Sequence, residues 1–194
     1  MISMKQLILA SASPRRKQLL ELLGLHFSVF PSEIEEKLIP GLTPRKQVEA
    51  LSKQKAEAVG AKFTNAIILA ADTMVVCGDE VIGKPKDEEA AKKILRKLSG
   101  TEHSIVTGFT LLDTETKKRV TKSTETKIWF RKISSKEIAE YIEREKPFDK
   151  AGAYAVHELA AVFIQKIEGD DSGATGLSVF LLTKELKKFG IEVL

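Results

Sequence analysis

The chain has 194 residues, 43% of them hydrophobic, and a formal net charge of +4. This content suits one domain or two small lobes with a real core, and we expect a single domain over residues 1–194. The positive excess is modest and spread along the chain, which argues against nucleic-acid binding and fits a small acidic ligand. No run approaches the roughly 20 apolar residues of a membrane span. The single Cys77 excludes an intramolecular disulfide, and we expect a cytoplasmic protein without a signal peptide.

An apolar run at residues 7–10 predicts a buried strand, and a helical pattern follows it. Ser13 is a good N-cap, and Pro14 suits the first helical position. Arg15 and Arg16 then fall in the first turn, where the helix dipole makes each cation cost about 0.3–1 kcal/mol. A bound anion would reverse that cost, so this turn is a candidate phosphate site. Two solvated arginines at a helix start are the alternative interpretation.

The rest of the chain alternates strands and helices without a strict strand–helix–strand period. We expect strands at 26–31, 66–71, 74–77, 81–85, 104–112, 124–130, 151–156 and 161–167, and helices that begin after Thr43, Asp87, Ser134 and Ser178. The strands at 74–77 and 81–85 are expected to form a hairpin, and those at 104–112 and 124–130 are expected to pair as a second hairpin through a polar turn. This order predicts an α/β (or α+β) fold with a mixed sheet and two lobes around a cleft.

Three further residues share a chemical theme with the two arginines. Lys55 falls on the apolar stripe of the second helix, and Lys84 lies in a constrained Gly-Lys-Pro turn. Asp72 comes directly after the strand at 66–71, a common place for functional groups in α/β sheets. Cations hold phosphates, and carboxylates hold Mg²⁺ or deprotonate water, so this set predicts a nucleoside polyphosphate site. Neither a P-loop motif nor a dinucleotide-binding glycine motif is present.

Each of these residues also has a simpler interpretation. Lys55 could extend along the helix surface to solvent, and Asp72 could close a turn. The acidic stretch at 32–36 could be a solvated loop.

These residues lie in blocks that resemble the Maf family, the septum-formation-inhibitor-like nucleotide pyrophosphatases. The blocks run in order through nearly the whole chain, at 9–16, 32–36, 53–56, 71–73, 83–85, 98–100 and 149–154. The resemblance implies hydrolysis of a nucleoside triphosphate to a monophosphate and pyrophosphate with a divalent cation, Mg²⁺ or Mn²⁺. It also implies a mixed sheet with a deep cleft, related to the inosine triphosphate pyrophosphatase architecture, and a homodimer.

The resemblance implies roles for individual residues. Asp72 matches the catalytic base, and Glu36 matches the acidic residue near the metal or the attacking water, so both carboxylates are expected to hold the metal. The phosphate-site positions are matched by Ser11, Ser13, Arg15, Arg16, Lys55 and Lys84, of which Lys84 is also expected to act in catalysis.

Base selection is where the sequence departs from the family. Arg15 with Thr73 matches the branch that prefers dTTP and UTP. A third specificity position, usually Gln in that branch, is His157 here, and residues 158–161 depart from a Gly-rich segment. A His cannot reproduce the paired donor and acceptor of a Gln amide, so we expect a broader substrate range still led by dTTP or UTP. The alternative function is a nucleotide-binding regulator of cell division or septum formation with little turnover.

Overall fold

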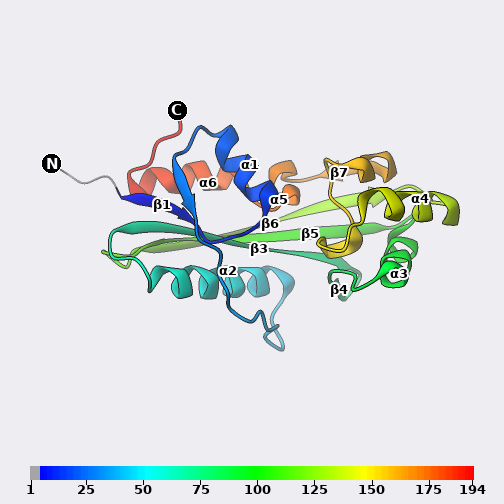
Figure 1. The fold of residues 1–194 in the computed structure, drawn as a ribbon, viewed down its shortest axis with the longest axis horizontal. Coiled ribbons are helices and arrows are strands. Elements are labelled where there is room, and N and C mark those ends of the chain that lie inside the picture. Colours follow the sequence, from blue (N-terminus) through cyan, green and yellow to red (C-terminus); the bar gives the residue numbers. More distant parts are fainter. Residues whose placement is uncertain (1–4) are drawn as a thin grey trace.

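The computed structural model describes residues 5–194, which form a seven-stranded mixed sheet flanked by helices (Figure 1). The strands are β1 Gln6–Leu9, β2 Phe27–Val29, β3 Ala66–Cys77, β4 Glu80–Ile82, β5 Glu102–Asp113, β6 Arg119–Phe130 and β7 Ile164–Glu168. The helices are α1 Pro14–Leu22, α2 Pro44–Gly60, α3 Glu88–Leu98, α4 Ser135–Glu145, α5 Asp171–Thr175 and α6 Val179–Leu186, with short 3₁₀ turns η1 Ala151–Ala153, η2 Leu159–Phe163 and η3 Lys187–Phe189. The predicted mixed α/β fold is confirmed.

Three long antiparallel strands run through the whole molecule. The sheet order is β2-β1-β3-β5-β6-β7, with β4 paired to β3, and only β1 pairs in parallel, with β2 and β3. β3, β5 and β6 have 12 residues each, so they span about 40 Å. Figure 1 shows α2 against one face of the sheet at one end of the long strands, and α1 and α6 against the opposite face. The elements α3, α4 and β4 lie at the other end of the long strands. The long strands therefore join two lobes.

The helix α2 packs unusually close to the sheet. A Cβ atom on Gly108 of β5 would lie 2.9 Å from the backbone carbon of Val48, so only glycine fits at that crossing. The close approach buries one side of α2, including Leu51 and Lys55. The sequence thus brings a lysine ammonium to the sheet surface rather than to solvent.

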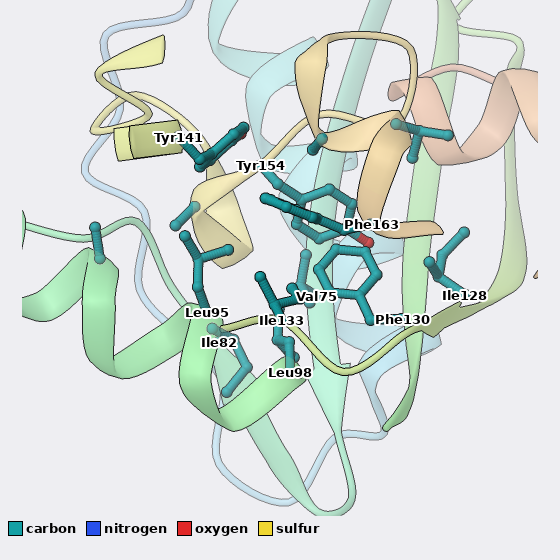
Figure 2. Close-up of a cluster of buried hydrophobic side chains, with 14 of the residues drawn as sticks. Val75, Ile82, Leu95, Leu98, Ile128, Phe130, Ile133, Tyr141, Tyr154 and Phe163 are labelled. Atoms are coloured by element: carbon teal, nitrogen blue, oxygen red, sulfur yellow. The ribbon is translucent and has the colours of Figure 1, made fainter. Parts of the chain in front are cut away.

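The second lobe has its own aromatic core, shown in Figure 2. Phe130 packs edge-on against Tyr154, with ring centroids 4.8 Å apart, and against Phe163 at 6.1 Å. His103 donates to or accepts from the Tyr154 hydroxyl at 2.6 Å and is buried. These contacts fix Tyr154, which also lines the cleft between the lobes.

Several predicted elements need correction. Asp72 and Thr73 do not follow a strand but lie inside β3, because β5 continues to pair with both residues and polar partners satisfy their side chains. Residues 151–156 are not a strand, since Gly152 and Ala153 have positive φ angles of 72° and 60°. The strand predicted at 161–167 is β7, which begins only at Ile164. Both predicted hairpins and all four predicted helix starts are confirmed.

The helix α5 was missed, because its five residues are too few to show a periodic pattern. No helix among the described residues is long and apolar enough to span a membrane.

Candidate active site

A cleft of about 550 Å³ lies between the lobes, and it collects every residue that the sequence singled out. Its lining includes Ser11, Ser13, Arg15, Arg16, Glu36, Lys55, Asp72, Thr73, Lys84 and His157. The structure therefore brings together side chains from α1, α2, β3 and four loops. Their individual roles stay predictions.

The start of α1 is built as the sequence predicts. The Ser13 hydroxyl accepts a hydrogen bond from the Arg16 amide at 3.5 Å, and Pro14 occupies the first helical position. The Ser11 hydroxyl accepts from the Ser13 amide at 3.3 Å. Each serine hydroxyl keeps its own proton, which it can donate to an anion in the cleft.

Arg16 is held in the cleft wall by hydrogen bonds and is not a solvated cation. Its Nε donates to the Gly176 carbonyl at 2.9 Å, and its two terminal nitrogens donate to Ser11 Oγ at 3.0 Å and Thr73 Oγ1 at 3.1 Å. Burial lowers the pKa of the guanidinium, while the nearby carboxylates of Asp72 and Glu36 oppose the shift. The alternative of two solvated arginines is therefore wrong for Arg16.

A chain of hydroxyls extends from Arg16 across the sheet to α5. Thr107 Oγ1 donates its single proton to the Gly173 carbonyl at 2.8 Å. Thr73 Oγ1 lies 2.9 Å from Thr107 Oγ1, so Thr73 is the donor in that contact. Among residues 5–194, Thr73 Oγ1 accepts a hydrogen bond only from Arg16. A Cβ atom on Gly173 would lie 2.5 Å from Thr124 Oγ1, which explains why α5 can approach the sheet so closely. Arg16, through Gly176, and Thr107, through Gly173, together tie α5 to α1 and β5.

Lys55 joins the two carboxylates of the site. Its Nζ lies 2.6 Å from Asp72 Oδ1 and 2.8 Å from Glu36 Oε1. Lys55 and Asp72 are 8% and 5% exposed, whereas the Glu36 side chain is largely exposed. Burial raises the pKa of Asp72, and the Lys55 ammonium opposes that rise. The interpretations of Lys55 as a solvent-directed lysine and of Asp72 as a turn residue are both wrong.

The same pair of carboxylates fits a divalent cation that arrives with a phosphate ligand. No group of three or more His, Cys, Asp or Glu side chains that could hold a metal occurs in residues 5–194. Mg²⁺ commonly binds through one or two carboxylates plus substrate phosphates and retains several waters. Asp72 and Glu36 each use one oxygen on Lys55 and have no other hydrogen bond in the described part of the chain. Their second oxygens suit such an ion.

Lys84 is the uncommitted cation of the cleft. It follows β4, is exposed, and makes no hydrogen bond or ion pair with the residues that the structure describes. The Gly83 carbonyl before it accepts from the Gly152 amide at 3.1 Å, which ties this turn to the second lobe. The Lys84 ammonium is free to meet a ligand.

Sequence reasoning missed three charged residues at or near the cleft, Lys150, Glu158 and Asp171. Arg15 lies 3.3 Å from Glu158, whose other oxygen lies 3.3 Å from Lys150. His157 Nε2 lies 2.9 Å from Asp171 Oδ2 at the start of α5. A signal for Glu158 was available in the sequence, because residues 158–161 depart from the Gly-rich segment of the family.

A match to the family described as Maf-like protein covers residues 6–189. The chain belongs to the Maf family. Among similar relatives of this Maf chain, the dTTP/UTP pyrophosphatase of Methanosarcina barkeri is 42% identical over 98% of this chain and 97% of its own length. The dTTP/UTP pyrophosphatase of Citrifermentans bemidjiense is 44% identical, with 95% of each chain covered.

Two solved structures overlap part of the fold of this Maf chain. The Ham1 protein of Staphylococcus aureus has 17% sequence identity and a TM-score of 0.43, covering 65% of this chain and 72% of its own. The HAM1 protein of Coxiella burnetii has 20% identity and a TM-score of 0.45, covering 66% and 73%.

Proposed function

We propose that this Maf chain hydrolyses nucleoside triphosphates between the α- and β-phosphates, with dTTP and UTP preferred. The observation that carries the proposal is Asp72, a buried carboxylate of raised pKa on the floor of a cleft lined by cations. Two relatives that are 42% and 44% identical to this chain over nearly its whole length are named dTTP/UTP pyrophosphatases. These names support the choice of reaction. Thr73 and Arg15, expected in that branch, both line the cleft.

In the proposed reaction, Asp72 accepts a proton from a water molecule as the water oxygen attacks the α-phosphorus. The bond from that phosphorus to the bridging oxygen breaks, and its electron pair leaves with pyrophosphate. Lys84, which has no partner in the described residues, meets the charge that develops on the leaving group. Arg15 and the hydroxyls of Ser11 and Ser13 hold the phosphates.

A divalent cation, Mg²⁺ or Mn²⁺, completes the proposed site. Glu36 and Asp72 would hold it together with the phosphates, and when bound it would neutralise phosphate charge. Lys55 then keeps both carboxylates in place by bridging them.

A nucleotide-binding regulator of cell division with little turnover would use the same cleft. It would bind phosphate through the cations but has no need of a proton acceptor. A buried carboxylate in the cleft is unfavourable for simple anion binding, because its negative charge would repel the phosphates of the ligand. The carboxylate therefore favours the enzyme.

The test is an assay of products with a panel of triphosphates in Mg²⁺ or Mn²⁺. We expect pyrophosphate and a nucleoside monophosphate, and Asp72→Asn should lower kcat roughly 10²–10⁴-fold through loss of the base. Asp113→Asn is a matched control, because Asp113 is a buried carboxylate 2.7 Å from Lys5 and lies outside the cleft. Release of orthophosphate, or a folded Asp72→Asn variant with near-normal turnover, would contradict the proposal.

We also propose a cytoplasmic location, where triphosphate pools are found, and no nucleic-acid or membrane partner. The homodimer implied by the family stays a prediction that light scattering can test.

A further inference from the structure

One carboxylate of the cleft wall sits between two cations. Glu158 places Oε1 3.3 Å from a terminal nitrogen of Arg15 and Oε2 3.3 Å from the Lys150 ammonium. Lys150 and Glu158 come from the neighbouring segments before η1 and η2, whereas Arg15 comes from α1, far away in the sequence. Arg15 and Glu158 line the cleft.

The two cations of this group differ in exposure. The Lys150 side chain is only 10% exposed and does not line the cleft, whereas the Arg15 side chain is 26% exposed and does. Lys150 also lies 3.0 Å from Asp149. Lys150 therefore holds Glu158 from behind, and Arg15 approaches it from the cleft side.

The contact with Arg15 is a weak one. Charge-assisted hydrogen bonds between guanidinium and carboxylate are usually about 2.7–2.9 Å long, and this one is 3.3 Å. Arg15 makes no other hydrogen bond or ion pair with the described residues, so it has nothing else to hold it in place. If Arg15 turned to another anion, Glu158 would keep Lys150 as a partner and would not be left as an unpaired charge.

We propose that Glu158 is an internal anion that occupies Arg15 in the free protein and competes with a triphosphate for it. Carboxylate and phosphate oxygens accept the same bonds from a guanidinium, so the two anions exclude each other at one face of Arg15. The proposal rests on the proposed function, because it takes the cleft to be the triphosphate site. Glu158 thereby lowers the affinity of the cleft for any phosphate ligand that binds through Arg15.

The competing view is that Glu158 only positions Arg15 for the ligand. The two roles predict opposite effects for one substitution. Glu158→Gln removes the charge but keeps an oxygen that can accept from Arg15, so positioning would survive while competition would not. Glu158→Ala removes both the charge and the acceptor.

The experiment is isothermal titration of the full chain with inorganic tripolyphosphate and with α,β-methylene-UTP, whose bridging carbon blocks the cleavage. We expect Glu158→Gln and Glu158→Ala to bind both ligands roughly fivefold more tightly, the scale of a partly exposed ion pair. Inhibition by UMP should also strengthen in both variants. Glu102→Gln is the control, because Glu102 pairs with Lys127 at 2.9 Å outside the cleft, and its affinities should equal those of the wild type.

Unchanged or weaker tripolyphosphate binding in Glu158→Gln would overturn the proposal. Wild-type affinity in Glu158→Gln with weaker binding in Glu158→Ala would assign Glu158 to positioning instead, and would also overturn it. These outcomes are separate from the proposed function, because tripolyphosphate binding requires no turnover. If the wild type binds tripolyphosphate but cleaves no nucleotide, the proposed enzymatic function is contradicted. The competition between Glu158 and phosphate for Arg15 can still be measured in that case.

Discussion

Two neighbouring arginines in the first turn of α1 offer a matched test of what each contributes to stability. By sequence alone, Arg15 and Arg16 are equivalent, and removing either should relieve the helix dipole by about 0.3–1 kcal/mol. The structure separates them. Arg16 donates three hydrogen bonds of 2.9–3.1 Å, and Arg15 makes one 3.3 Å contact with Glu158. We expect Arg16→Met and Arg15→Met to have different effects.

The magnitude follows from these contacts. Each hydrogen bond contributes about 1 kcal/mol net, so Arg16→Met loses about 3 kcal/mol and recovers less than about 1 kcal/mol from the dipole. The net loss is about 2 kcal/mol. The partly exposed pair of Arg15 is worth about 0–1 kcal/mol, which the dipole relief offsets, so Arg15→Met should be nearly neutral.

Urea denaturation without ligand, followed by circular dichroism, measures both variants. The expected result is a lower midpoint for Arg16→Met, an unchanged midpoint for Arg15→Met, and similar m-values for all three proteins. Equal midpoints for the two variants would refute the reasoning, because the bonds to Ser11, Thr73 and Gly176 would then contribute nothing. Weaker tripolyphosphate binding by Arg15→Met, despite its normal midpoint, would separate the ligand-facing arginine from the structural one.

Two further predictions concern histidines. The Asp171 carboxylate accepts from His157 Nε2, which leaves Nδ1 of the neutral ring as a lone acceptor. His157→Gln restores a paired donor and acceptor, so it should sharpen the preference for dTTP and UTP. The measurement is kcat/KM for triphosphates of the four bases. Unchanged ratios of kcat/KM would show that His157 does not contact the base. Burial lowers the pKa of His103 to about 4, so the unfolded chain takes up this proton near pH 6.5 and the folded chain only near pH 4. Stability should therefore fall by up to about 3 kcal/mol on acidification through that window, and the loss should be absent in His103→Gln; parallel pH profiles would contradict this.

The parts of the fold that could be predicted are those set by neighbouring residues. The caps Ser13, Thr43, Asp87, Ser134 and Ser178 all accept from the backbone of their helices, because capping depends on a few adjacent positions. The hairpins were also predictable, since a turn lies between two patterned runs. Asp72 was misplaced because a polar residue in an apolar run resembles a strand end, and only Lys55 on another element shows that it is satisfied inside the strand.

Contacts between segments far apart in the sequence left no local signal. Arg15 and Glu158 are 143 positions apart, and Thr107 and Gly173 are 66 apart. The residues around each partner do not indicate which residue it contacts. The sequence could therefore predict which residues line the site, but not which of them pair with one another. The pairing is what assigns different roles to residues of the same type.

That pairing changes how much positive charge the cleft can offer a triphosphate. Sequence reasoning treats Arg15, Arg16, Lys55 and Lys84 as equal phosphate ligands. In the structure, Lys55 is shared by two carboxylates, Arg16 is committed to the wall, and Arg15 is opposed by Glu158, which leaves Lys84 without a counter-ion among the described residues. Such a cleft attracts a bare triphosphate only weakly, because its charges are already compensated internally. On the proposed function, we therefore predict that the second carboxylate oxygens of Asp72 and Glu36 make the site prefer the complex of the nucleotide with a divalent cation, which carries its own neutralising charge.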